Sequence, residues 1–263
     1  MNLQISASIT DFPLQTPIET FFRKFKEAGV DTVELVIGAK TINVPRMFAL
    51  SQKYQLPIVS FHQSPWSGFG FSFDENFIIQ AKQYGVTTYT FHPLTFMSFD
   101  SKQMKQYFIK LKEIQEKYAI TICLENMPPE FFYKKLFDTS DKTIISHLES
   151  MYIIAKQYNL SLTYDVSHTQ FTHPQNHDIF REMLSRIKNI HISSFHGDQE
   201  HLPLDKGDFA TKAFVQFLYK QKYTGLLTFE INYSLTKRIF TPYNFLEIKR
   251  SIDIIKSVSD KSS

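Results

Sequence analysis

The most constraining feature of this sequence is a repeated alternation of short apolar segments with longer amphipathic ones. The short segments have the length of strands and are rich in β-branched and aromatic residues, whereas the longer ones carry apolar residues at helical spacing. Eight such pairs follow one another without a linker, a low-complexity stretch or a block of like charges. Strands that alternate with helices indicate a parallel sheet, because each strand is reached by a crossover connection.

The eight pairs favour a closed barrel over an open sheet. The predicted strands are 3–8, 32–37, 57–62, 87–92, 120–125, 160–165, 189–193 and 225–231. The predicted helices are 17–28, 44–54, 74–84, 102–118, 144–158, 177–187, 209–221 and 244–258. A (β/α)8 TIM barrel usually takes about 250 residues as one domain, and no GxGxxG or GxxxxGK phosphate loop of an open nucleotide-binding sheet is present. We therefore predict a single α/β barrel domain over 1–258, with a frayed tail at 259–263.

Composition limits the compartment and the partners. The single cysteine, Cys123, leaves no internal disulfide, and the N-terminus lacks the basic and apolar regions of a signal peptide. No apolar run reaches the roughly 18 residues of a membrane span. We therefore expect a soluble cytoplasmic protein with no membrane partner. A net charge of +3 neither indicates nor excludes nucleic acid, and a homo-oligomer is compatible with the sequence.

Imidazole and carboxylate side chains stand at the carboxyl ends of six consecutive predicted strands. They are His62, His92, Glu125, Asp165 with His168 just beyond it, His191 and Glu230. In a barrel these strand ends surround one mouth, where the active sites of this fold lie. A single strand-end histidine is usually structural, but so many polar groups in one small volume are costly to bury without partners. One or more bound divalent metal ions would remove that cost. His147, His173 and His177 are expected on the surface.

Several short motifs resemble those of the xylose isomerase-like TIM barrels. This superfamily holds sugar and sugar-phosphate isomerases and epimerases, and also endonuclease IV. The motifs are FHP at 91–93, LEN at 124–126, YDVSH at 164–168, HIS at 191–193, HLPLDKGD at 201–208 and FEIN at 229–232. Their order and spacing cover nearly the whole chain, and they are specific to the superfamily but not to one activity.

The resemblance implies a core metal site and a first hypothesis for function. The ligands would be Glu125, Asp165, His191 and Glu230. In epimerase-type members one divalent ion holds the carbonyl and hydroxyl oxygens of the substrate, and two glutamates, here Glu125 and Glu230, exchange protons with the adjacent carbon. The leading hypothesis is a metal-dependent isomerase or epimerase of a small sugar, sugar phosphate or related hydroxy-carbonyl compound.

A second set of residues supports an alternative. The endonuclease IV-like members hold three zinc ions, and their additional ligands correspond here to His62, His92, His168 and His201. They also use an aspartate two residues before the last histidine, where this chain has Gln199, with Asp198 one position away. The alternative is thus a zinc phosphodiesterase acting on abasic DNA, with nucleic acid as a partner only in that case. A third possibility is a barrel that binds metal and ligand without turnover.

The ligand types and the loops after the strands give the remaining expectations. Histidine-rich ligand sets favour zinc or manganese, with magnesium or cobalt as alternatives, and the number of ions is one to three. The predicted substrate contacts are Trp66, Asn126, Lys237 and Arg238. Trp66 lies in the aromatic loop QSPWSGFGFSF at 63–73, which would close over the substrate or pack on the barrel rim. Against DNA, the loop at 38–43 is short and carries no arginine.

Overall fold

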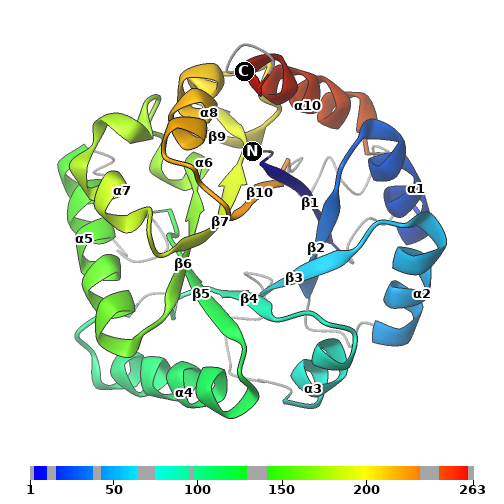
Figure 1. Ribbon diagram of the computed structural model, residues 1–263. Coiled ribbons are helices and arrows are strands. Elements are labelled where there is room, and N and C mark those ends of the chain that lie inside the picture. The colour runs from blue at the N-terminus through cyan, green and yellow to red at the C-terminus, as the bar shows by residue number, and fades with distance from the viewer. Residues whose placement is uncertain are drawn as a thin grey trace.

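The computed structural model describes residues 3–10, 16–37, 43–63, 75–94, 97–128, 141–231 and 243–259. These residues form a closed barrel of parallel strands inside a ring of helices (Figure 1). The strand order around the barrel is β1-β10-β7-β6-β5-β4-β3-β2, so the last barrel strand pairs with the first. The predicted TIM barrel is therefore confirmed. No helix in the described part of the chain is long and apolar enough to cross a membrane.

The eight predicted strand–helix pairs follow the predicted order, and one short helix at Val166–Thr169 was not predicted. The barrel strands are β1 (Gln4–Thr10), β2 (Thr32–Ile37), β3 (Ile58–Gln63), β4 (Thr88–Phe91), β5 (Thr121–Glu125), β6 (Ser161–Asp165), β7 (Ile187–Ile192) and β10 (Leu226–Phe229). The helices are α1 (Ile18–Ala28), α2 (Val44–Tyr54), α3 (Glu75–Gln83), α4 (Lys102–Tyr118), α5 (Asp141–Tyr158), α6 (Val166–Thr169), α7 (Asp178–Met183), α8 (Thr211–Lys220) and α10 (Phe245–Ser259). A short 3-10 turn, η3 (Pro174–Asn176), precedes α7.

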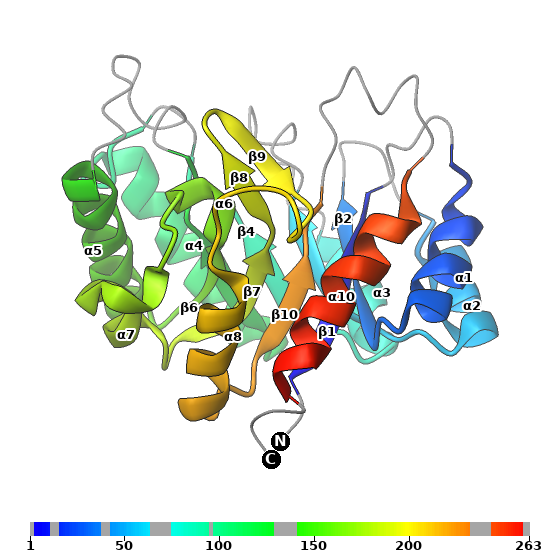
Figure 2. The ribbon, with the colours of Figure 1, turned by 90° about the horizontal axis from the view of Figure 1, so that it is seen from above.

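Two segments around β7 differ from the prediction. The predicted helix 177–187 is too long: α7 ends at Met183, and Ile187 already pairs with Leu162 of β6. The helical spacing of apolar residues continues to Ile187 in the sequence, but backbone pairing with β6 makes this residue part of a strand. After β7, β8 (Ser194–His196) and β9 (Gln199–Leu202) form an antiparallel hairpin that the sequence reading did not predict. This hairpin rises at the end of the barrel toward which the strands point, opposite the start of β1 (Figure 2).

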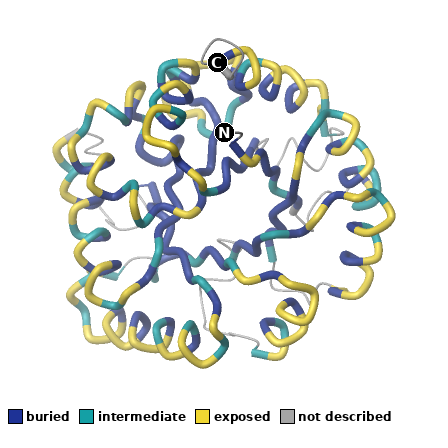
Figure 3. The backbone as a smooth tube through the Cα atoms, viewed as in Figure 1, coloured by how far each residue is buried: buried dark blue, intermediate teal, exposed yellow. Residues whose placement is uncertain are grey.

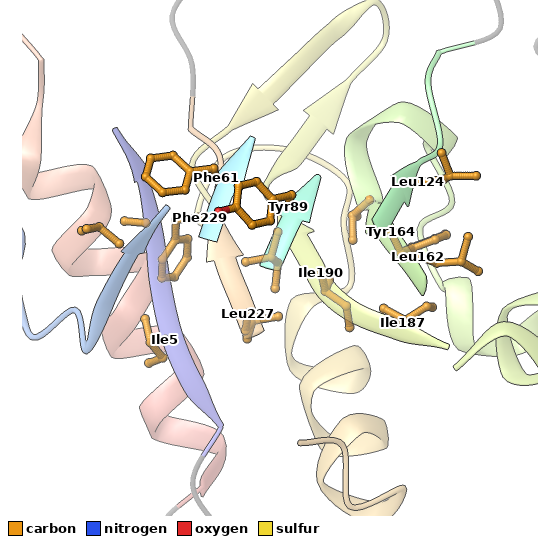
Figure 4. Close-up of a cluster of buried hydrophobic side chains, with 14 of the residues drawn as sticks. Ile5, Phe61, Tyr89, Leu124, Leu162, Tyr164, Ile187, Ile190, Leu227 and Phe229 are labelled. Atoms are coloured by element: carbon orange, nitrogen blue, oxygen red, sulfur yellow. The ribbon is translucent and has the colours of Figure 1, made fainter. Parts of the chain in front are cut away.

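Outward-facing strand residues build the hydrophobic core against the helices. Figure 4 shows this layer, which includes Phe61, Tyr89, Tyr164 and Phe229. The ring of Tyr164 lies 4.7 Å from that of Phe180 on α7. Full burial of one such side chain stabilises the fold by about 2 kcal/mol. The helices expose only their outer faces to water (Figure 3).

Inward-facing strand residues are instead small or polar. The buried ones include Ser6, Ser60, Thr90, Thr163, Asn189 and Thr228. Because side chains alternate along a strand, the residue two positions further on faces the same interior, nearer the carboxyl end. Two positions after Ser60, Thr163, Asn189 and Thr228 stand His62, Asp165, His191 and Glu230. The alternation of side chains along each strand therefore places the second, ligand-type residue of each of these pairs at the barrel mouth.

Candidate metal centre

The ends of β5, β6, β7 and β10 bring together the four predicted core ligands. Glu125, Asp165, His191 and Glu230 are all buried, and each offers one ligand atom within 4.8 Å of the others. His191 Nδ1 lies 3.0 Å from Glu125 Oε1, 2.7 Å from Glu230 Oε2 and 3.7 Å from Asp165 Oδ2. One imidazole nitrogen and three carboxylates around one point form a donor set suited to a divalent cation.

A second ligand group lies toward β3 and β4 and shares Glu125 with the first. His62 Nε2 and His92 Nε2 each lie 2.8 Å from Glu125 Oε2, and they lie 2.8 Å from one another. All three side chains are buried. Two imidazole nitrogens, from the predicted additional ligands His62 and His92, and a carboxylate oxygen therefore converge on a second point.

A third group is formed by Asp165, His168 and His201. His168 Nδ1 donates to the backbone carbonyl of Asn126 at 2.7 Å, and His201 Nδ1 donates to that of Glu230 at 3.1 Å. A carbonyl oxygen only accepts, so these bonds place a hydrogen on Nδ1. In the neutral ring Nε2 then carries the lone pair, which is the form that binds metal.

The oxygens of Asp165 test whether a cation fits the site. Oδ1 accepts from Ser167 Oγ at 2.8 Å and from the backbone N–H of His168 at 3.0 Å. Oδ2 is buried and, among the described residues, accepts no hydrogen bond. Such an oxygen is costly to bury alone. A divalent cation between Asp165, His191 and Glu230 would satisfy it, so the residues present fit a metal.

The charges of the site shift one another's pKa values. Burial works to raise the pKa of the Glu125 carboxyl, but His62 and His191 hold it well below its usual range. Burial works to lower the pKa of His191, but Glu34, Glu125 and Glu230 raise it well above its usual value. For His168, Asp165 and Glu125 likewise outweigh burial and raise the pKa to about 9. Without a metal the site is thus a network of ion pairs, and metal binding must displace protons from its histidines.

Glu34 is a site residue that the sequence reading missed. It is fully buried in the middle of β2, and its Oε1 lies 3.0 Å from His191 Nε2. The missed signal is a lone carboxylate within the apolar strand TVELVI, where burial of a charge demands a partner. The prediction considered only strand ends, whereas Glu34 faces the interior one layer below the mouth.

The predicted substrate contacts have different outcomes. Trp66, Lys237 and Arg238 lie outside the described residues. Asn126 is described, and both polar atoms of its side chain are engaged: Nδ2 donates to the carbonyl of Asp165 at 2.9 Å, and Oδ1 accepts from its N–H at 2.8 Å. Its amide therefore joins the ends of β5 and β6.

Two further sequence expectations can be compared with the structure. The expectation that His147 lies on the surface was wrong: it is buried on α5, where its ring stacks on Phe99 at 5.1 Å and burial lowers its pKa to about 4. Asp198 and Gln199 are both exposed on the β8–β9 hairpin. Neither belongs to a ligand group of the described residues.

The sequence matches a known protein family and a relative of similar length. A family model described as xylose isomerase-like TIM barrel matches residues 22–257. The uncharacterized protein MJ1614 of Methanocaldococcus jannaschii is 25% identical over 235 residues, which cover 84% of this chain and 88% of that protein.

Solved structures share the fold at low sequence identity. A D-tagatose 3-epimerase-like protein matches with a TM-score of 0.69 and 18% identity, covering 99% of this chain and 100% of that chain. A family 2 AP endonuclease from Brucella melitensis matches with a TM-score of 0.65 and 18% identity, covering 89% and 94%. A xylose isomerase-like TIM barrel protein from Mycobacterium smegmatis in complex with magnesium matches with a TM-score of 0.67 and 13% identity, covering 98% and 97%. At these identities the matches establish the fold alone.

Proposed function

Since the chain belongs to the xylose isomerase-like TIM barrel family, we propose that it is a divalent-metal-dependent isomerase or epimerase of a small sugar, sugar phosphate or related hydroxy-carbonyl compound. The observation that carries this proposal is the convergence of Glu125, Asp165, His191 and Glu230 on one point at the barrel mouth. The fold shared with the D-tagatose 3-epimerase-like protein is consistent with it.

The positions of the two glutamates suit a proton transfer. When bound, the divalent ion would polarise the carbonyl of the substrate. Glu125 and Glu230 come from different strands and approach the same nitrogen, His191 Nδ1, at 3.0 and 2.7 Å. Their carboxylates therefore flank one point. One glutamate would accept the proton from the carbon next to the carbonyl, and the other would return a proton to it.

The other two ligands would orient the site. Asp165 is held by hydrogen bonds to one oxygen, which leaves the second directed toward His191 and His201 at 3.7 and 4.0 Å. His191 is fully buried and contacts carboxylates through both ring nitrogens. Ligands whose own positions are fixed in this way hold a substrate in one orientation, which proton transfer between two carboxylates requires.

The additional histidine groups favour a second candidate function. The second and third ligand groups share Glu125 and Asp165 with the core group, so the residues of these groups would hold further ions beside the first. Several ions together would supply charge stabilisation for the oxygens of a phosphoryl transfer. The alternative is therefore an endonuclease IV-like zinc phosphodiesterase acting on abasic DNA. The family 2 AP endonuclease shares the fold and is compatible with this alternative.

Metal content separates these proposals. Protein purified without chelator should be analysed by elemental analysis, together with the Glu230→Gln variant. About one ion per chain, lost in the variant, supports the isomerase or epimerase, and a panel of sugars and sugar phosphates follows. Two or three zinc ions per chain support the phosphodiesterase, with abasic-site DNA and phosphate esters as substrates to test. No bound ion after reconstitution refutes both enzymes and leaves a non-catalytic binding barrel.

The control for this experiment is a carboxylate outside the site. Glu75 on α3 lies 2.8 Å from Lys117 and is exposed enough for water to solvate it. The Glu75→Gln variant removes one ion pair at the barrel surface, which is worth at most about 1 kcal/mol. It should retain the metal content of the unaltered protein. A loss of metal in both variants would indicate a general effect of mutation rather than loss of a ligand.

A further inference from the structure

Glu34 lies below the core ligand group, in the barrel interior. Its Oε2 accepts hydrogen bonds from Ser60 Oγ and Asn189 Nδ2, each at 2.8 Å. On Oε1, Ser8 Oγ lies at 3.3 Å and His191 Nε2 at 3.0 Å. Donors from β1, β3 and β7 therefore fix the carboxylate in one orientation. A buried charge with this many partners is held firmly, because any displacement would leave several of them unsatisfied.

His191 links Glu34 to the metal ligands through its two ring nitrogens. Nε2 faces Glu34, whereas Nδ1 faces Glu125 and Glu230 at 3.0 and 2.7 Å. An ionised carboxylate only accepts, so in the metal-free protein the carboxylates on both sides of the ring favour a hydrogen on each nitrogen, and the amide nitrogen of Asn189 lies 3.1 Å from Nε2. A cation held by Glu125, Asp165 and Glu230 would displace the hydrogen on Nδ1, and the ring would then keep the hydrogen on Nε2, which faces Glu34. This is the form in which histidine binds a metal.

Asn189 reinforces the orientation of Glu34. Its Oδ1 accepts from Thr228 Oγ1 at 2.7 Å, which identifies this atom as the amide oxygen and leaves the amide nitrogen facing Glu34 Oε2. Two residues later on the same strand, His191 points in the same direction. Asn189 and His191, two inward-facing residues of β7, thus both contact the carboxylate of Glu34.

We propose that Glu34 is a positioning residue that holds His191 with the hydrogen on Nε2 and directs Nδ1 at a metal ion bound with Glu125, Asp165 and Glu230. This inference deepens the proposed function and rests on its metal site. A carboxylate behind a ligating histidine fixes the ring and increases the basicity of the ligand nitrogen. Loss of such a partner lowers metal affinity by about 10- to 100-fold.

A purely structural role for Glu34 makes a different prediction. A carboxylate that only fills the barrel interior could be replaced by the isosteric amide at a cost in stability alone. Thr90 offers a matched control, because it is buried in the same interior and its hydroxyl bonds to Thr163 Oγ1 at 2.8 Å. The Thr90→Val variant removes this bond without changing a ligand group or a partner of His191.

The test compares zinc binding by the metal-free forms of the unaltered protein, Glu34→Gln and Thr90→Val. Each is titrated with zinc in competition with a chromophoric chelator. Glu34→Gln should bind its tightest ion about 10- to 100-fold more weakly, whereas Thr90→Val should match the unaltered protein. Equal affinity in Glu34→Gln and the unaltered protein overturns the role of Glu34. An unaltered protein that binds no zinc refutes the metal site itself, and with it this inference.

A second measurement does not depend on whether the variant folds. Long-range proton–nitrogen NMR spectra of the zinc-loaded unaltered protein, with labelled histidine, report which ring nitrogen of His191 carries the hydrogen. We expect the hydrogen on Nε2 and the metal on Nδ1. A hydrogen on Nδ1 of His191 overturns the proposal. If Glu34→Gln folds, its spectrum should show this preference lost or reduced, and Thr90→Val should retain it.

Discussion

Replacing Asn126 by alanine tests whether this residue builds the site or contacts the substrate. Its side-chain amide bonds to both backbone polar groups of Asp165, at 2.9 and 2.8 Å. The variant removes both bonds and leaves the N–H and the carbonyl of Asp165 buried without these partners. Because Asp165 is a proposed ligand, we expect a loss of stability and a loss of metal affinity together.

The magnitude follows from the two hydrogen bonds. Each buried bond contributes about 1 kcal/mol net, and a buried backbone group left without a partner costs about 1–3 kcal/mol. Partial relaxation and water entry reduce the sum, so the free energy of unfolding should fall by about 2–5 kcal/mol. Urea denaturation of the metal-free protein measures this change. Competitive zinc titration measures the accompanying loss of affinity.

Gln115 on α4 provides a matched control at the other end of the barrel. Its amide also joins two backbone groups, donating to the Asn159 carbonyl at 2.9 Å and accepting from the Ile122 N–H at 2.9 Å. Gln115→Ala should lose stability but retain zinc affinity. An Asn126→Ala variant that keeps its stability and zinc affinity, and only raises the KM for the substrate, would refute the positioning role.

Three further predictions concern pH, backbone strain and core packing. The pKa of His168 is raised to about 9, so its charged form stabilises the metal-free protein fully below about pH 6.5. Up to about 3 kcal/mol of the free energy of unfolding should be lost as the pH rises to about 9. Urea denaturation at several pH values measures this loss, and a flat profile contradicts it. Gly207→Ala should lower stability by about 1–3 kcal/mol in thermal unfolding, because φ is +124° and the new Cβ would lie 2.4 Å from the Phe195 carbonyl oxygen; an unchanged Tm contradicts it. Leu162→Ala in β6 should cost about 2–5 kcal/mol in urea denaturation and leave zinc content unchanged; loss of zinc in the folded variant contradicts it.

Most element boundaries could be predicted because their signals are local. The predicted ranges of β2, α2 and α4 agree with the structure to the residue. Asn43 caps α2 by accepting from the N–H of Arg46, and Ser101 caps α4 in the same way from Met104. The errors near β7 arose where tertiary pairing decided the conformation. Ile187 continues a helical pattern but belongs to a strand because β6 is beside it.

The candidate site was predictable in outline because strand period and barrel closure are general rules. Once eight parallel strands close, the strand-end residues must meet at one mouth, and the sequence alone identifies His62, His92, Glu125, Asp165, His168, His191 and Glu230 as those residues. Among the described residues these side chains lie in four overlapping ligand groups, in which His201 joins Asp165 and His168, and Glu34 joins His62 and His191.

The sequence by itself determined the barrel, the inward positions and the types of side chain at its mouth, because each follows from patterns within a few residues. Tertiary structure decided the partner of each atom. The bond between Glu34 and Asn189 joins residues 155 positions apart, and no local pattern reports such a contact. Closure of the barrel brings Glu34 against His191 and Asn126 against the backbone of Asp165. These contacts form because buried charges and amides must find partners wherever the fold supplies them.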